Sequence, residues 1–325
     1  MQPPVSVVTP VHNGAKYLAE CIESVLRQTY QNWEYIIVNN CSQDDTLEIA
    51  TSYAQNDDRI HIYNNDNFVG VMEIHNIALR HISPDSKYCK ILHADDLLFP
   101  ACIAQMVKVA ADHPKVGIVG AYGLKESRVV WDGLPYPSTV VRGKEICRRS
   151  LLGGFYVFGS PTSHLIRSDY IRKTEDFYAG NEYHVPYMDQ EACYKVLANS
   201  DFGFVHQVLT FTREHQDSLT CSFENTKLNT DLPSLLTILT KYGQWYLNSE
   251  EFDRRYRQIM DRYYRFLARS LFRKRSRRFW EYHRNAMNYA GHPLNALELA
   301  RGLSLELGDL LLNPKVLIAK ALGKA

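Results

Sequence analysis

The sequence lacks the features that mark a secreted, zinc-stabilised or membrane-spanning protein. Its seven cysteines are odd in number and scattered, without a CxxC pair, which indicates neither a disulfide framework nor a zinc site and fits a reducing compartment. No window approaches the ~18 consecutive apolar residues of a membrane-spanning helix. The N-terminus MQPPVSVVTPVHNG enters a strand pattern without the basic and apolar regions of a signal peptide. We therefore expect a cytoplasmic protein that does not cross a membrane.

GxGxxG and P-loop motifs are also absent, so the sequence suggests neither a dinucleotide cofactor nor hydrolysis of a nucleoside triphosphate. Of 325 residues, 45% are hydrophobic and 22% are charged, which is close to the average for soluble globular proteins and excludes a disordered or fibrous chain. The length exceeds the ~100–200 residues of one domain. We expect one large domain with an appendage, or two domains.

Positive charge is concentrated in one segment. Residues 241–284 carry a net charge of +8 in a chain of net charge +1, which leaves −7 for the rest. Such asymmetry indicates a basic face that can meet nucleic acid or an anionic membrane. The aromatic residues of this segment share one helical stripe and resemble core rather than exposed stacking platforms, so we expect no nucleic-acid partner. We favour an anionic membrane surface, and a solvated helix face is the alternative.

The first 120 residues alternate strand-like and helix-like patterns. Strands are expected at residues 5–9, 33–38, 59–63, 88–92 and 116–119. Strands separated by helices of ~10–15 residues predict βαβ units and a parallel sheet. Ligands of such sheets bind beyond the carboxyl ends of the strands. Polar residues follow three of these strands, so we expect one crevice lined by His12, Asn13, Asn39, Asn40 and residues 93–96.

Asp95 and Asp96 form the strongest chemical signal. Adjacent carboxylates repel each other and usually have a cation nearby, and their hard oxygen atoms select Mg²⁺ or Mn²⁺. Such an ion commonly completes its shell with substrate phosphates. The alternative interpretation is a solvated turn that caps the helix beginning near Pro100.

Three stretches resemble, in order and spacing, the motifs of family-two glycosyltransferases. They are SVVTPVHNGAKYLAECIESVLRQTYQNWEYIIVNNCSQDDT from Ser6, NFVGVMEIHNIAL from Asn67 and KILHADDLLFP from Lys90. The resemblance covers residues 4–215. It implies a GT-A fold, an α/β Rossmann-like architecture whose mostly parallel central sheet is flanked by helices. It also implies transfer of a sugar from a nucleotide-diphosphate donor to an acceptor hydroxyl, with inversion at the anomeric carbon.

The resemblance and the patterns together predict the domain organisation. Residues 1–225 would form the GT-A domain, with a nucleotide-binding half at 1–120 and an acceptor half at 121–225. Residues 226–325 read as a helical, basic and amphipathic C-terminal region.

The resemblance also implies a donor site. Thr9, Pro10 and His12 would line the nucleoside pocket. Asn40 stands where the family usually has an aspartate that accepts a hydrogen bond from the uracil N–H; because an amide also donates, uridine is favoured and another base stays open. Further donor contacts are implied for Asn67, Asn76, Asp95 and Arg213. His75 replaces the arginine that more usually precedes Asn76.

Metal and base roles follow from the same resemblance. Asp96 would bind the metal directly, and His215 would be an additional ligand. His93 stands where the first acid of the motif is often found, and a ligand or a purely structural role is equally open. Asp189, at a predicted helix start, would be the base that takes the proton from the acceptor hydroxyl, with Glu191 as the fallback. A helix N-terminal acid is the alternative role of Asp189.

These features predict a metal-dependent glycosyltransferase that acts on a glycan or lipid-linked acceptor. We expect it in bacterial surface polysaccharide synthesis, peripheral on the inner face of the plasma membrane. Two alternatives stay open. A sugar-phosphate nucleotidyltransferase would need a Gly-rich basic loop after the first strand, which VHNGAKYL matches poorly. A catalytically silent relative that binds a glycan or a membrane is supported by Asn39, Asn40 and His93, which replace expected acids.

Overall fold

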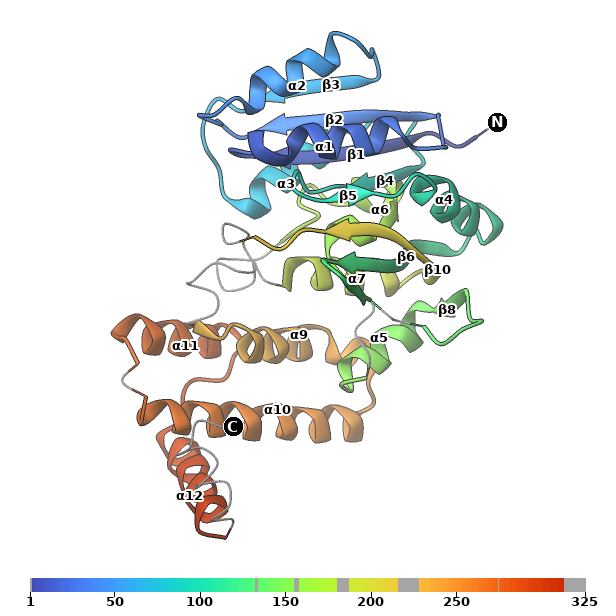
Figure 1. Ribbon diagram of the computed structural model, residues 1–325. Helices are drawn as coiled ribbons and strands as arrows, with labels where there is room; N and C mark the ends of the chain where they lie inside the picture. The colour runs from blue at the N-terminus through green and yellow to red at the C-terminus, as the bar shows by residue number, and fades with distance from the viewer. Residues whose placement is uncertain are drawn as a thin grey trace. The chain divides into compact units, whose positions relative to one another are not determined.

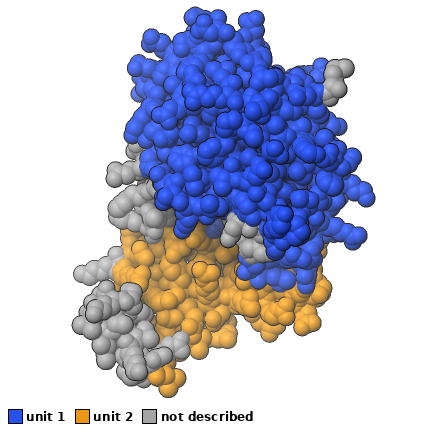
Figure 2. All heavy atoms as spheres, turned by 45° about the vertical axis from the view of Figure 1, so that its right-hand side comes forward, with its two compact units in different colours: residues 1–218 blue, residues 219–325 orange. Residues whose placement is uncertain are grey.

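The computed structural model describes residues 2–131, 134–154, 158–179, 187–215, 228–273 and 275–312. The chain divides into two compact units, residues 1–218 and 219–325 (Figure 2). The predicted boundary at residue 225 lies outside the described residues. Residue 120, the predicted division between the two halves of the first domain, lies inside a strand, so both halves share one sheet.

The described part of unit 1 is built on one ten-stranded sheet, in the order β3-β2-β1-β4-β9-β6-β10-β5, with β7 beside β6 and β8 beside β10 (Figure 1). The strands are β1 (Val5–Val11), β2 (Trp33–Asn39), β3 (Ile60–Asn64), β4 (Tyr88–Ile91), β5 (Leu97–Leu98), β6 (Val116–Lys125), β7 (Arg128–Val130), β8 (Val140–Arg142), β9 (Leu165–Arg167) and β10 (Asp201–Thr212). Strands β1 to β4 are parallel, as are β6 and β10, while β9 is antiparallel to β4 and β6. The predicted α/β class with a mostly parallel sheet is confirmed.

Helices connect and cover these strands. They are α1 (Ala15–Leu26), α2 (Thr46–Ala54), α3 (Val71–Arg80), α4 (Cys102–Asp112), α5 (Gly143–Leu151), the 3₁₀ turn η1 (Pro161–Ser163), α6 (Ser168–Arg172) and α7 (Met188–Leu197). All seven residues of β1 are buried, which is typical of a parallel strand covered on both faces. In α1 the apolar residues Leu18, Ile22 and Val25, which recur at helical spacing, are buried against this sheet, and Leu26 of the same pattern is partly buried.

Strand β10 is the main element that sequence patterns did not predict. Its register against β6 shifts at three points, including the step from Val205 to Val208. Such bulges break the period-two alternation on which strand prediction depends. Strand β10 matters for the site because Arg213 directly follows its last residue.

Unit 2 is helical in its described residues, as predicted. Its helices are α9 (Asp231–Tyr246), α10 (Ser249–Leu271), α11 (Arg277–Tyr289) and α12 (Ala296–Leu312). Helix α10 buries Tyr263 of the predicted aromatic stripe together with Ile259, and it exposes Arg254 and Arg257 on the opposite side. Among the helices that the structure describes, none has both the length and the apolar character needed to span a bilayer.

Candidate active site

Strands β1, β2 and β4 are neighbours, and the residues that follow them lie at one edge of the sheet. Strand β1 pairs in parallel with both β2 and β4, so their carboxyl ends point the same way. After β2, the backbone N–H of Asn40 donates to the Val11 carbonyl over 2.8 Å. Nδ1 of His12 lies 2.7 Å from the Asn40 carbonyl oxygen. The loops after β1 and β2 are therefore in contact, and the residues after β4 leave the sheet at the same edge.

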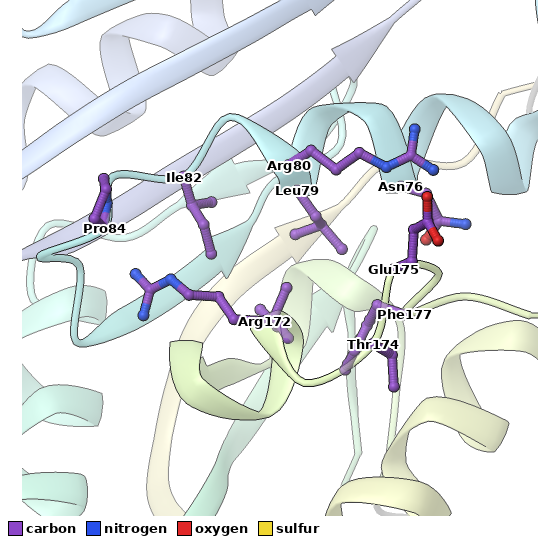
Figure 3. A pocket seen from close by; sticks show the side chains of 10 residues that line it. Asn76, Leu79, Arg80, Ile82, Pro84, Arg172, Thr174, Glu175 and Phe177 are labelled. Atoms are coloured by element: carbon purple, nitrogen blue, oxygen red, sulfur yellow. The ribbon is translucent and has the colours of Figure 1, made fainter.

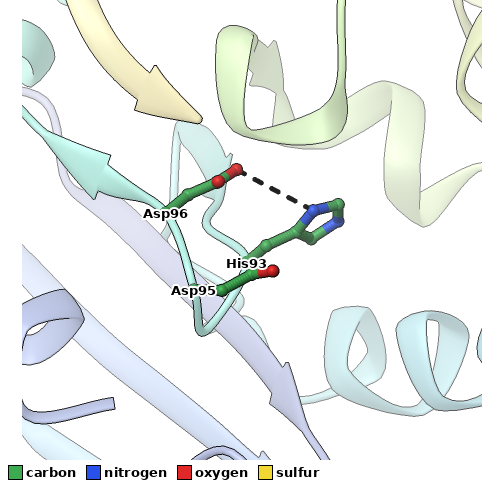
Figure 4. Close-up of side chains that lie close together, drawn as sticks. All are labelled: His93, Asp95 and Asp96. Carbon is green, nitrogen blue, oxygen red and sulfur yellow. Dashed lines mark ion pairs between the residues drawn. The ribbon is translucent and has the colours of Figure 1, made fainter. Parts of the chain in front are cut away.

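His93, Asp95 and Asp96 form a compact group in the loop after β4 (Figure 4). One potential ligand atom of each lies within 4.8 Å of those of the other two. The Nδ1 atom of His93 lies 4.0 Å from Oδ2 of Asp96. Carboxylate oxygens are the donors that Mg²⁺ and Mn²⁺ prefer, so the donor set fits the predicted ion.

Asp96 is only 2% exposed, and its carboxylate is held from two sides. Oδ2 accepts a hydrogen bond of 2.6 Å from the Thr162 hydroxyl, and Oδ1 accepts one of 3.2 Å from the backbone N–H of Arg213. Burial, with the nearby charge of Asp95, raises the pKa of Asp96 to about 6, although His93 acts in the opposite direction. A buried carboxylate with a raised pKa favours a bound cation, which would restore its charged form.

Arg213 and His215 reach the same group from the segment after β10. The Arg213 guanidinium donates through Nε to the Asp95 carbonyl over 3.1 Å and through Nη2 to Glu20 over 2.7 Å. Nε2 of His215 lies 2.8 Å from Oδ2 of Asp95. The structure thus brings the predicted Arg213 and His215 beside Asp95 and Asp96. His215 contacts Asp95 directly, and its role as a metal ligand stays a prediction.

Asp189 lies in the first turn of α7, as predicted. Its Oδ1 atom is buried and has no hydrogen-bond partner among the described residues. Burial raises the pKa of Asp189 to about 7, and the charge of His93 lowers it in part. The fallback, Glu191, is also buried, and Oε1 lies 3.5 Å from the Lys195 ammonium one turn along. A carboxylate with a pKa near neutrality is suited to take up a proton at physiological pH.

The predicted nucleoside contacts of Thr9 and Pro10 stay predictions, and only the expected place of these residues after the first strand is corrected. Both residues lie within β1 rather than after it, and both are buried. The Thr9 hydroxyl has no exposed surface and donates to the Leu92 carbonyl over 2.7 Å. Thr9 therefore holds β4 against β1, whereas His12 beyond the strand is exposed and its ring centroid lies 4.7 Å from that of Phe68.

Asn40 serves the loop that follows β3. It is 3% exposed, and its amide group donates to the Val69 carbonyl over 2.9 Å. Its side-chain oxygen accepts from the Val69 N–H over 3.1 Å and from the Asn65 amide over 3.2 Å. The oxygen expected to receive a base N–H thus accepts two hydrogen bonds within the protein, and the predicted base contact stays a prediction. Asn67 is exposed on the same loop.

Asn76 is likewise committed to the protein. It is 3% exposed and exchanges two hydrogen bonds with the backbone of Tyr178, over 2.8 and 2.9 Å. Its predicted donor contact stays a prediction. Asn76 lies at one end of a pocket of about 370 Å³ beside α3 and α6 (Figure 3). The pocket is lined by Asn76, Leu79, Arg80, Ile82, Pro84, Ile171, Arg172, Thr174, Glu175 and Phe177, and so includes no member of the His93 group.

The sequence analysis did not single out Lys90, which lies in β4, the strand that precedes the His93 group. Lys90 has no exposed surface, and its ammonium donates to the carbonyls of Thr162 and His164. It thereby holds η1, from which Thr162 donates to Asp96. A lysine inside an otherwise apolar strand pattern was the available signal, because a charged side chain is almost never fully buried without a specific partner.

Comparisons with known proteins give the family. EpsE of Bacillus subtilis, named as a candidate glycosyltransferase, is 31% identical over 229 residues, which cover 65% of this chain and 78% of EpsE. Residues 1–349 of TarS from S. aureus, solved in complex with UDP-GlcNAc, superpose with a TM-score of 0.65 at 17% identity, over 88% of this chain and 80% of that one. The mannosyltransferase PcManGT from Pyrobaculum calidifontis, solved with GDP-Man and Mn²⁺, gives a TM-score of 0.53 at 17% identity, over 100% of this chain and 87% of that one. These likenesses confirm the GT-A fold. Residues 6–174 match the family described as "Glycosyl transferase family 2", and the chain therefore belongs to this family of glycosyltransferases.

Proposed function

We propose that this protein transfers a sugar, with inversion, from a UDP sugar to a hydroxyl of a glycan or lipid-linked acceptor, and that it depends on Mg²⁺ or Mn²⁺. One observation carries the proposal: the buried carboxylate of Asp96 lies with Asp95 and His93 at the carboxyl edge of the sheet. This is the edge at which open α/β sheets bind their ligands. UDP is favoured because TarS, the neighbour with the higher TM-score of the two, was solved with a UDP sugar.

The proposed function assigns a separate role to each of these side chains. Asp96 would hold the ion, with His215 as an additional ligand and Asp95 in contact with the donor, and a divalent ion supplies Lewis-acid stabilisation to a leaving diphosphate. Arg213, whose side chain is 21% exposed beside Asp95, would add positive charge for the same phosphates. Asp189 would take the proton from the attacking acceptor hydroxyl as the new glycosidic bond forms. Its burial keeps the pKa near the working pH, which is what a general base requires.

We also propose that unit 2 attaches the enzyme to the inner face of the plasma membrane. Exposed arginines of α10, with the net charge of +8 over residues 241–284, supply attraction to anionic lipids. Attachment there would suit a lipid-linked acceptor and a role in surface polysaccharide synthesis.

A screen of nucleotide sugars tests the transferase proposal. With Mn²⁺ present, one UDP sugar is expected to be hydrolysed or transferred by the full-length protein and to raise its melting temperature by mass action. Asp96→Asn should abolish both effects, whereas Asp189→Asn should lower turnover by about 10²–10⁴-fold and keep the thermal shift. A protein that no nucleotide sugar stabilises would instead be the catalytically silent relative.

A further inference from the structure

His75 contacts His93, a member of the group proposed to bind the metal ion. It lies on α3 and is 6% exposed. Its Nδ1 is 2.7 Å from the Val71 carbonyl oxygen, and its Nε2 is 3.3 Å from Nε2 of His93. The two rings are nearly perpendicular, at 84°, with centroids 5.4 Å apart. Each ring nitrogen of His75 therefore has a defined partner.

These contacts determine where the protons are. A carbonyl oxygen only accepts hydrogen bonds, so Nδ1 of His75 must carry the hydrogen that binds Val71. In a neutral imidazole the other nitrogen is then an acceptor. Burial supports the neutral form, because an imidazolium at 6% exposure whose hydrogen-bond partners are a carbonyl and a second imidazole would be an uncompensated buried charge. The hydrogen between the two Nε2 atoms consequently belongs to His93.

The tautomer of His93 determines which of its ring nitrogens can bind a metal ion. A neutral His93 that is protonated at Nε2 has a lone pair on Nδ1. Nδ1 is the atom that lies 4.0 Å from the Asp96 carboxylate (Figure 4). The opposite tautomer would place an N–H there, and an N–H cannot bind a metal ion.

We propose that His75 is a positioning residue that fixes the tautomer of His93 and thereby presents Nδ1 as a ligand for the divalent ion. The ligand role rests on the proposed metal-dependent function, but the tautomer does not. Ligating histidines commonly have their second nitrogen fixed by such a partner, and loss of the partner typically weakens metal binding about 10–100-fold. Here an uncharged histidine takes the place usually held by a carboxylate or a carbonyl.

The tautomer can be measured directly, without any metal, in the full-length protein labelled with ¹⁵N-histidine. Long-range ¹H–¹⁵N correlation spectra distinguish the two neutral tautomers, and the His93 signals are assigned by their loss in His93→Gln. We expect the hydrogen on Nε2 of His93 in the wild type and a mixture of tautomers in His75→Leu. A hydrogen on Nδ1 in the wild type would overturn the proposal, whether or not the variant folds.

Mn²⁺ affinity, read from the electron paramagnetic resonance of free Mn²⁺, tests the ligand role. His75→Leu should weaken binding about 10–100-fold, and His75→Gln should weaken it less because its amide oxygen can accept from His93. His283→Leu is the matched control, since His283 is also buried, with its Nδ1 2.7 Å from the Tyr263 hydroxyl in unit 2. Equal Mn²⁺ affinity in His75→Leu and wild type would overturn the ligand role. If the wild type binds no Mn²⁺ while the tautomer is as expected, the proposed metal dependence fails and the positioning of His93 stands.

Discussion

Asp96 and Asp189 are buried aspartates with different surroundings, and the proposed function gives them different roles. Asp96 is buried but receives hydrogen bonds from Thr162 and from the Arg213 backbone, and it has Asp95 beside it. Asp189 has one carboxylate oxygen without a described partner. The first arrangement suits a cation, and the second suits a proton. Both carboxylates have raised pKa values because burial disfavours their charged forms.

If Asp189 is the base, turnover should follow its ionisation. The pKa of about 7 predicts that kcat rises with pH through this value, since only the carboxylate accepts a proton. Asp189→Asn should lower kcat by about 10²–10⁴-fold and remove this rise. The measurement is a pH–rate profile at saturating donor and Mn²⁺. An unchanged profile in the variant would transfer the role to another group, with Glu191 as the first to test.

The burial of Asp189 also predicts that its carboxylate lowers the free energy of unfolding at neutral and alkaline pH. The pKa of Asp189 rises from 3.8 to about 7 on folding, so its contribution destabilises the folded state increasingly as pH rises between these values and fully above about 7. Asp189→Asn should therefore raise the free energy of unfolding at pH 8, by about 1–3 kcal/mol, and have little effect below pH 4. Urea unfolding at the two pH values measures the difference. A variant less stable than wild type at pH 8 would show that the carboxylate is paired.

At the scale of helices and strands, sequence patterns predicted elements that bury a periodic face. The stripe of Leu18, Ile22 and Val25 in α1 is an example, because each lies against the sheet. Asp95 and Asp96 were also predictable as a pair, since they adjoin each other in the chain. The bond from Thr162 to Asp96 was not, because it joins residues 66 positions apart. Contacts of that separation depend on the sheet order, which local periodicity does not determine.

Helix α10 offers a test of local sequence effects in unit 2. Asn248 caps this helix: its side chain accepts from the Glu251 N–H over 2.9 Å, and Glu251 accepts from the Asn248 N–H. Asn248→Ala should lower the free energy of unfolding by about 1 kcal/mol, whereas Asn248→Asp should keep the cap. Chemical denaturation of the full chain, followed by circular dichroism, measures both. Equal losses in the two variants would mean that the cap contributes nothing.

At the scale of the whole molecule, positive charge is concentrated in one segment and the rest of the chain has a net negative charge. Residues 241–284 carry +8 in a protein of net charge +1. Composition alone predicted this division, but the exposure of individual arginines required the structure. Some of them are paired within unit 2, as Arg269 is with Glu306 over 3.6 Å. Exposed members such as Arg254, Arg257 and Arg262 are therefore the ones to test.

Replacing Arg254, Arg257 and Arg262 together with Gln should weaken binding to anionic vesicles on the order of 100-fold, from about 1 kcal/mol each near the surface. Co-sedimentation with phosphatidylglycerol vesicles at low salt measures the loss. The matched control replaces Lys87, Lys108 and Lys115, which are exposed on unit 1, with Gln. Equal binding of the wild type to neutral and anionic vesicles would contradict membrane attachment through charge.

The central claim is that a divalent ion at Asp96 holds the diphosphate of the donor. Isothermal titration of the full-length protein with UDP, in Mn²⁺ and in EDTA, tests it most directly, with Asp96→Asn as the variant and Asp112→Asn, an exposed carboxylate on α4, as the control. We predict that UDP binds the wild type and the control only with Mn²⁺ and does not bind Asp96→Asn measurably. UDP affinity that is equal in Mn²⁺ and EDTA, or unchanged in Asp96→Asn, would contradict the claim.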